Sequence, residues 1–333
     1  MPKVSVIIPT YNAGKFVREA VDSVLNQAYE DYEIIVVDGG SVDNTRELLS
    51  SYGEKIRFIR QTDRGVAAAR NVGIFNSKGE YVAFLDADDQ WLPQKLKLQV
   101  EYLDEHPAVG LVFSDAWCIT GGEPLPSDFH FVKRTSQISK PFRGKVFDKL
   151  FVRNFIPCLS VLVRRACLDK VGLFDTSLSL AEDYDLWLRI ARITSVHYID
   201  QPLAIYRKHV ESLSHNVESG EKEIESIILL KKKMIDFDPS LRAKLNHRTM
   251  ETAYYHYYID LGIIQFKKGE RWKARKNFRQ YMQLSLLNPR VYFLVLMTFI
   301  PFRRRAVQGL SANKFVSVVS RAENSLRQRW RSG

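Results

Sequence analysis

Asp86, Asp88 and Asp89 stand within four residues of one another. They follow the apolar run 81–85, which predicts a strand, so they are expected in a loop at its carboxyl end. Carboxylates this close repel one another strongly in a partly dry crevice, and a divalent cation would neutralise them. Mg²⁺ held by one or two carboxylates usually completes its shell with substrate phosphates. The alternative is a solvated Asp-rich turn that caps the helix expected after Pro93.

The segments ahead of this cluster alternate between short Val- and Ile-rich runs and amphipathic stretches. They predict strands over 4–8, 33–37, 56–60 and 81–85, and helices over about 13–28, 43–50 and 66–76. This alternation implies a parallel sheet covered by helices on both faces. In such sheets ligands bind beyond the carboxyl ends of the strands. Polar segments fall at three of these ends, and their convergence predicts a crevice for a nucleotide and a metal.

Five segments, taken in order, resemble the family 2 glycosyltransferases of GT-A fold. They are Pro9-Thr10-Tyr11-Asn12, Val37-Asp38-Gly39-Gly40-Ser41-Val42-Asp43, Gly65-Val66-Ala67-Ala68-Ala69-Arg70-Asn71-Val72-Gly73, Asp86-Ala87-Asp88-Asp89 and Glu182-Asp183-Tyr184-Asp185-Leu186-Trp187-Leu188-Arg189. Five segments in order over roughly residues 3–215 are a specific pattern. The resemblance implies an α/β, Rossmann-like GT-A domain with a mostly parallel sheet and helices on both faces. It also implies an inverting transferase that uses a nucleotide-activated sugar and Mn²⁺ or Mg²⁺.

Carried over residue by residue, the resemblance makes Asp86 and Asp88 the DxD pair. Asp88 would ligate the metal directly, whereas Asp86 would face the ribose or the metal. Arg70 would sit near the base or the diphosphate. The nucleoside pocket would be lined by Pro9, Thr10, Tyr11 and Asp38.

Arg207 and His209 match a family position close to the donor diphosphate, and the resemblance adds His209 to the metal site. A cationic pair there would offset phosphate charge. Without the resemblance, an exposed basic loop would be the better interpretation. A divalent metal acting as a Lewis acid can stabilise the diphosphate leaving group, so no protein general acid is required.

Asp183 is the base that the resemblance implies, placed opposite the anomeric carbon to deprotonate the acceptor hydroxyl. Its neighbours Glu182 and Asp185 favour the protonated form, whereas the start of a helix favours the anion, so the direction of its pKa shift stays open. The alternative is that these carboxylates only complement the dipole of the helix that follows.

Gly39 departs from the family pattern. The family commonly has a second Asp at this position, and that carboxylate often reads the edge of the nucleobase. Here Gly39 and Gly40 would instead let the backbone approach the ligand closely. A uridine diphosphate donor is favoured.

The charge of the 333-residue chain is unevenly placed. Residues 1–219 contain 26 basic and 29 acidic side chains, whereas residues 220–333 contain 23 basic and 9 acidic ones. The length allows about two domains. We expect a catalytic GT-A domain over 1–215, with a nucleotide-sugar half over about 1–113 and an acceptor half over about 114–215. A basic helical region over 216–333 follows it.

The C-terminal region contains two further patterns. Residues 248–287 predict a helix pair joined at 268–270, and a single such period favours an αα-hairpin over a tetratricopeptide solenoid. The mostly apolar run 291–302 precedes three arginines at 303–305, which is typical of an interfacial segment on an anionic leaflet. The alternative is that 291–302 and the amphipathic stretch 315–326 pack as core.

The cysteines favour a reduced compartment. Cys118, Cys158 and Cys167 form no CxxC pair. The first predicted strand begins almost at Met1, and no run reaches the roughly 20 apolar residues that a spanning helix needs. We therefore expect a cytoplasmic protein, with peripheral contact at the inner face of the plasma membrane.

Three function classes can be compared. A glycosyltransferase that moves a sugar to a saccharide or lipid-linked acceptor, in cell-surface polysaccharide or lipopolysaccharide assembly, accounts for every motif. A dinucleotide-dependent oxidoreductase predicts G-x-G-x-x-G after a strand, but the loop at 9–14 reads PTYNAG. A non-catalytic nucleic-acid binder would use the basic tail and leave the acidic crevice unexplained, so no nucleic-acid partner is expected.

Overall fold

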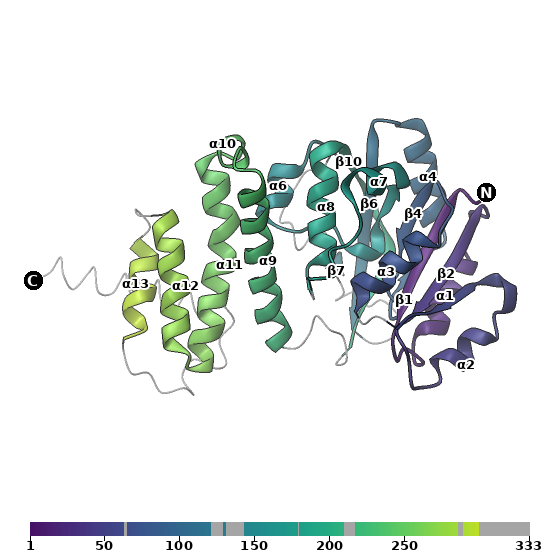
Figure 1. Ribbon diagram of the computed structural model, residues 1–333, viewed down its shortest axis with the longest axis horizontal. Coiled ribbons are helices and arrows are strands. Elements are labelled where there is room, and N and C mark those ends of the chain that lie inside the picture. Colours follow the sequence, from purple (N-terminus) through teal and green to yellow (C-terminus); the bar gives the residue numbers. More distant parts are fainter. Residues whose placement is uncertain are drawn as a thin grey trace, which may run out of the picture. The chain divides into compact units, whose positions relative to one another are not determined.

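A computed structural model of the chain describes residues 1–62, 65–120, 129–130, 143–178, 180–209, 217–285 and 289–299. The chain forms two compact units, residues 1–216 and residues 217–333. Figure 1 shows strands and helices alternating in the first unit, and helices in the described part of the second.

The first unit is built on a mixed ten-stranded sheet of order β3-β2-β1-β4-β9-β6-β10-β5, with β7 paired to β6 and β8 to β10. The strands are β1 (Val4–Thr10), β2 (Tyr32–Asp38), β3 (Arg57–Arg60), β4 (Tyr81–Phe84), β5 (Gln90–Trp91), β6 (Val109–Thr120), β7 (Phe129–His130), β8 (Arg143–Gly144), β9 (Leu162–Arg164) and β10 (Ser195–Lys208). The first four strands pair in parallel, as the alternation predicts, whereas β9 is antiparallel to β4 and β6. The carboxyl ends of β1 to β4 therefore meet at one edge.

Helices cover both faces of the parallel part. They are α1 (Val17–Leu25), α2 (Thr45–Ser50), α3 (Val66–Phe75) and α4 (Lys95–Glu105), and the 3-10 turn η1 (Gly53–Lys55) lies between α2 and β3. Alternate strand residues face opposite ways: Ile34 and Val36 pack in a core with α1 and α4, whereas Ile35 and Val37 pack against α3. Gly73 permits the close approach of α3, since a Cβ there would lie 2.4 Å from Ile7.

The second half of this unit adds α6 (Phe147–Val152), the 3-10 turn η2 (Cys158–Ser160), α7 (Arg165–Val171) and α8 (Glu182–Ile193). Tyr184 anchors α8, because its hydroxyl donates to the Leu150 carbonyl oxygen of α6 at 2.6 Å. This packing fixes the first turn of α8, which carries the predicted base.

Helix α1 begins later than the sequence predicts, at Val17 instead of residue 13. Asn12 has a positive φ of 48°, and the next two backbone N–H groups donate to side chains of the loop after β2. Ala13 N–H reaches Thr45 Oγ1 at 2.8 Å, and Gly14 N–H reaches Asp43 Oδ2 at 2.9 Å. These residues therefore belong to the loops at the sheet edge, which they tie together.

The second unit contains α9 (Val217–Phe237), α10 (Leu241–Lys244), α11 (His247–Lys268), α12 (Arg271–Leu284) and α13 (Pro289–Met297). The predicted helix pair is present as α11 and α12. Asn246 caps α11 by accepting from Thr249 N–H at 2.8 Å, and Gly269 ends it in the left-handed conformation, at φ 84°. Gly262 allows Phe278 of α12 to pack directly on α11.

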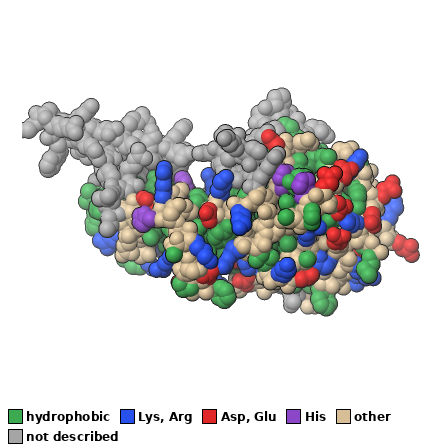
Figure 2. All heavy atoms as spheres, turned by 90° about the horizontal axis from the view of Figure 1, so that it is seen from above, with side chains coloured by type: hydrophobic (Ala, Val, Ile, Leu, Met, Phe, Trp, Pro, Cys, Tyr) green, Lys and Arg blue, Asp and Glu red, His purple; other side chains and the backbone are tan. Residues whose placement is uncertain are grey.

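Helix α13 has two different faces. Val291 and Leu294 are buried, whereas Tyr292 and Leu296 are exposed. No described helix is long and apolar enough to cross a membrane. The three arginines at 303–305 and the amphipathic stretch 315–326 lie outside the described residues. In Figure 2, Asp and Glu side chains gather over the first unit, in line with the uneven charge of the sequence.

Replacing Gly262 by Ala should destabilise the second unit, because the new Cβ would lie 2.3 Å from Phe278 Cε1. Overpacking of this kind costs about 1–3 kcal/mol, so a urea melt followed by circular dichroism should show an earlier transition. Gly220→Ala in α9 is the matched control, since its Cβ would meet no atom within 4 Å. Equal midpoints for the two variants would contradict this packing of α12 on α11.

Candidate active site

The acidic cluster lies where the sequence places it, directly after β4. Asp89 N–H donates to the Asp86 carbonyl oxygen at 3.0 Å, which closes a turn over the three carboxylates. Asp88 Oδ2 lies 2.9 Å from His209 Nε2, at the end of β10. Burial, and then the charge of Asp86, raises the pKa of Asp88, and burial raises that of Asp89 well above its usual range. Burial therefore disfavours the ionised forms of both carboxyls.

Arg70 joins this cluster to the start of α8. Its side chain is buried, donating from Nη2 to Asp86 Oδ1 at 2.7 Å and from Nη1 to Glu182 Oε1 at 2.6 Å. The structure pairs Arg70 with two carboxylates, and its expected place near the base or the diphosphate stays a prediction. Its Nε is buried without a hydrogen-bond partner among the described residues. Arg70 therefore joins the strand end after β4 to the first turn of α8.

Three carboxylates lie in the first turn of α8, and arginine side chains pair with two of them. Glu182 pairs with Arg70, and Asp185 Oδ2 accepts from Arg189 Nη2 at 2.6 Å. Asp183 lies between them, accepting from Tyr184 N–H at 2.6 Å. Burial, followed by the charge of Glu182, raises the pKa of Asp183 to about 7, although Arg70 acts in the opposite direction. Burial and Glu182 thus outweigh the helix start, which settles the direction that the sequence left open.

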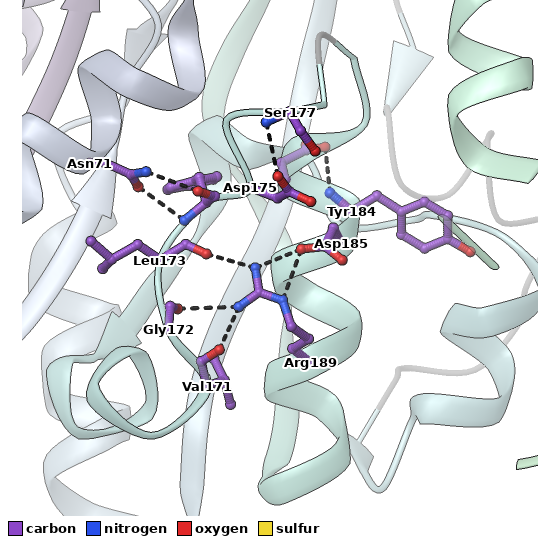
Figure 3. Close-up of polar contacts among 11 residues, drawn as sticks. Asn71, Val171, Gly172, Leu173, Asp175, Ser177, Tyr184, Asp185 and Arg189 are labelled. Atoms are coloured by element: carbon purple, nitrogen blue, oxygen red, sulfur yellow. Dashed lines mark hydrogen bonds and ion pairs between the residues drawn. The ribbon is translucent and has the colours of Figure 1, made fainter. Parts of the chain in front are cut away.

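Arg189 and Asn71 hold the loop that leads into α8, as Figure 3 shows. Arg189 Nη1 donates to the Val171 carbonyl oxygen at 2.7 Å, and Nη2 donates to that of Leu173 at 2.8 Å. The Asn71 side chain makes two hydrogen bonds with the backbone of Phe174. Its Nδ2 donates to the carbonyl oxygen at 2.9 Å, and its Oδ1 accepts from the N–H at 3.0 Å. Asp185 orients Arg189 from the other side. The described part of this loop is therefore tied both to α3 and to α8.

The predicted nucleoside residues lie at the ends of β1 and β2. Pro9 and Thr10 are buried, whereas the Tyr11 ring is 64% exposed. Asp38 is buried, and its carboxylate accepts from the backbone N–H and the hydroxyl of Ser41. The structure therefore brings these four residues to the edge of the sheet that carries the acidic cluster.

Arg207 lies at the same edge, but it is engaged by protein groups. Its backbone N–H donates to Asp89 Oδ1 at 2.8 Å, and its Nη2 lies 2.5 Å from Glu19 Oε2. The guanidinium also lies 4.9 Å from the centre of the Phe16 ring. Asp89 thus holds the end of β10, and with it His209, against the acidic cluster.

Sequence reasoning missed the partners of several motif residues. Glu182 and Asp89 were visible as acidic residues, but not as the groups that hold Arg70 and β10. Asn71 follows Arg70 directly, so its place in the motif was a signal. Nothing in the sequence pointed to Glu19, because its partner Arg207 lies 188 residues away.

The residues at this edge fit a divalent cation that is ligated partly by the protein and partly by the oxygens of a diphosphate. Among the described residues, no three His, Cys, Asp or Glu side chains are grouped closely enough to hold a metal alone. Asp88 and His209 supply two adjacent donors, whereas Asp86 Oδ1 is taken by Arg70. Mg²⁺ characteristically uses one or two carboxylates and fills its shell with water and phosphate oxygens. The donor set therefore agrees with binding that depends on the nucleotide.

Solved structures support the fold. The structure of S. aureus TarS 1–349 in complex with UDP-GlcNAc aligns with 97% of this chain and 92% of that one, at a TM-score of 0.67 and 19% identity. The mannosyltransferase PcManGT of Pyrobaculum calidifontis, in complex with GDP-Man and Mn²⁺, aligns over 96% of this chain and 86% of its own, at a TM-score of 0.57 and 20% identity.

Sequence comparisons support the family. The model of the protein family described as "Glycosyl transferase family 2" matches residues 5–170. An uncharacterized glycosyltransferase of Rickettsia typhi is 36% identical over 231 residues, which cover 68% of this chain and 70% of that protein. The putative teichuronic acid biosynthesis glycosyltransferase TuaG of Bacillus subtilis is 30% identical over 67% of this chain and 85% of its own. With these matches, and with the motifs gathered at one edge of a GT-A sheet, the chain belongs to glycosyltransferase family 2.

Proposed function

We propose that the chain transfers a sugar, with inversion, from a uridine diphosphate sugar to a hydroxyl of a saccharide or lipid-linked acceptor in cell-surface polysaccharide assembly. Similarity to TuaG and to the TarS complex with UDP-GlcNAc supports this substrate class. One structural observation carries the proposal. Arg70 ties Glu182 to Asp86, and so holds Asp183, whose pKa is raised to about 7, beside the acidic strand end.

Asp183 acts as the general base. Its carboxylate accepts the proton of the acceptor hydroxyl while the oxygen attacks the anomeric carbon. The bond from that carbon to the phosphate oxygen breaks on the opposite face, and its electron pair leaves with the nucleoside diphosphate. A base with a pKa near 7 combines a useful ionised fraction with proton affinity at neutral pH. Glu182 and Asp185 are less suited, because Arg70 and Arg189 hold their carboxylates.

Asp88 and His209 would hold Mn²⁺ or Mg²⁺, with Asp86 beside them. When bound, the cation would stabilise the developing charge on the diphosphate. Before the nucleotide arrives, His209 stays against Asp88, and Phe16 packs on the His209 ring at 4.7 Å. These contacts place the imidazole next to the carboxylate in advance.

The donor nucleotide would occupy the neighbouring strand ends. Tyr11 offers an exposed ring face to the base, and Asp38 is held in place by Ser41. Arg207 would offset diphosphate charge once it leaves Glu19, whose side chain is half exposed. An oxidoreductase is not favoured, since neither the family match nor the loop after β1 points to a dinucleotide.

Asp88→Asn should abolish the Mn²⁺-dependent part of nucleoside diphosphate binding and leave the fold intact, because an amide cannot replace an anionic ligand. Calorimetry with UDP, with and without Mn²⁺, measures this part. Asp148→Asn, on an exposed position of α6, is the control and should bind like the wild type. Metal-linked affinity that persists in Asp88→Asn would refute the assignment.

Asp183→Asn should lower turnover by roughly 10² to 10⁴ with donor affinity nearly unchanged, the usual range for losing a general base. In the wild type, kcat/KM for the acceptor should rise with pH and level off above about 7, because burial and Glu182 raise the pKa of Asp183 to that value. Below it the carboxyl is protonated and cannot accept the acceptor's proton. Turnover of Asp183→Asn at the wild-type level would move the role to Glu182 or Asp185.

The second unit would hold the enzyme at an anionic membrane surface. The exposed face of α13 carries Tyr292 and Leu296, and the three arginines at 303–305 follow it. Each basic residue near such a surface contributes about 1 kcal/mol. The buried face of α13 has a different role, because Val291 and Leu294 are already covered by protein.

Tyr292→Ser/Leu296→Ser should therefore reduce sedimentation of the protein with phosphatidylserine vesicles at low salt, without lowering the melting temperature. Raised salt should weaken wild-type binding as well, since charges are screened beyond about 8 Å at physiological ionic strength. Leu229→Ser removes an equally exposed apolar side chain from α9 and serves as the control. If the wild type ignores vesicles at low salt, or all three proteins sediment alike, α13 is not a membrane contact.

A further inference from the structure

The ends of β1, β2 and β3 bring three residues side by side. Gly39 N–H donates to the Thr10 carbonyl oxygen at 2.9 Å, and Gln61 N–H donates to the Asp38 carbonyl oxygen at 2.9 Å. These bonds continue the parallel ladder by one step past the strands. Gly39 therefore lies in the centre, with Thr10 on one side and Gln61 on the other.

Gln61 carries a buried polar group that the protein leaves unsatisfied. The residue is 8% exposed, and its Oε1 has no hydrogen-bond partner among the described residues. Thr10 Oγ1 is buried and without such a partner as well. Leaving a buried acceptor or donor without a partner is unfavourable. Two such groups at one ligand-binding edge indicate that a ligand supplies the missing partners.

The missing side chain of Gly39 leaves space beside Gln61. A Cβ at this position would lie 3.6 Å from the Thr10 carbonyl oxygen, 3.7 Å from Tyr11 Cδ2 and 3.8 Å from Gln61 Nε2. The exposed Tyr11 ring and the Gln61 amide thus border the same small volume. A planar group that lies against the ring would present its edge to the amide.

We propose that Gln61 reads the edge of the donor's nucleobase and is a specificity-determining residue of this enzyme. Gln61 Oε1 would accept from the uracil N3–H, and Nε2 would donate to the adjacent uracil carbonyl oxygen. This inference rests on the proposed uridine diphosphate donor. It also accounts for Gly39, because the Gln61 amide, directly after β3, takes the place of the carboxylate that the family commonly has directly after β2.

The proposal distinguishes a polar contact from mere packing. A site that hydrogen-bonds a ligand group rejects an analogue that cannot form the bond, because the protein group is then left unpaired. The 5′-diphosphate of 3-methyluridine lacks the N3–H and keeps the ribose, both phosphates and both carbonyl groups. It therefore probes the contact at N3, and the Gln61→Met variant separates the lost hydrogen bond from the added bulk of the methyl group.

Calorimetry in the presence of Mn²⁺ tests the proposal with UDP, its 3-methyl analogue and inorganic pyrophosphate. The wild type should prefer UDP to the analogue by about tenfold or more, the factor that loss of one hydrogen bond with a buried partner produces. In Gln61→Met, which keeps length but removes both polar atoms, this preference should fall to about twofold. Pyrophosphate should bind both proteins equally, and Gln94→Met, at an exposed glutamine of the same unit, should behave as wild type.

Two further variants protect the test against a folding defect. Gln61→Glu keeps an acceptor and should retain the preference for UDP over the analogue, although its charge weakens UDP itself. Gly39→Asp in the Gln61→Met background places a new acceptor in the same volume, where the Cβ meets only ordinary contacts. It should restore the preference, which a merely structural role of Gln61 does not predict.

The outcomes separate this inference from the proposed function. An unchanged preference in Gln61→Met, or no restoration by Gly39→Asp, would overturn the role of Gln61 while UDP binding itself upholds the donor class. A wild type that binds pyrophosphate with Mn²⁺ but treats UDP and the analogue alike would also overturn it. If the wild type binds no nucleoside diphosphate at all, both the inference and the proposed donor are wrong.

Discussion

The buried guanidinium of Arg70 is the interaction on which the site depends. It is nearly enclosed, and Asp86 and Glu182, from the two halves of the first unit, accept its hydrogen bonds. A buried charge is tolerated only when it is paired, and removing one partner of such a pair typically costs about 3–5 kcal/mol. The strand end after β4 and the start of α8 are therefore held together by necessity. This contact also fixes the position of Asp183, which follows Glu182 directly in the chain.

A second constraint follows from the charge that remains. Arg70 satisfies one carboxylate of the acidic cluster, and burial raises the pKa of Asp88, Asp89 and Asp183. Each raised pKa means that the ionised form is disfavoured until a positive charge or a proton arrives. For Asp88 a divalent cation would remove this cost, and for Asp183 the acceptor's proton would. Burial thus has the same effect on all three carboxyls, which lie after β4 and in the first turn of α8.

The two units have different bases of stability. The first is a covered sheet, whose strand residues alternate between two apolar layers. The second consists of helices in which small residues set the distance of approach, as at Gly262 under Phe278. Its sequence carries the net positive charge, with 23 basic and 9 acidic side chains over residues 220–333, whereas the acidic cluster belongs to the first unit.

The sequence by itself determined the elements that local periodicity controls. The alternating strands and helices, the convergence of polar segments at one sheet edge and the α11–α12 pair all followed from spacing and turn residues, because these depend on near neighbours. The tertiary structure decided which charged groups pair. Arg70 and Glu182 are 112 residues apart, and their contact, together with that of Arg189 and Asp185, distinguishes Asp183 from its acidic neighbours. The pKa of Asp183 and the unsatisfied amide of Gln61 likewise depend on burial and on through-space distances, which no local pattern encodes.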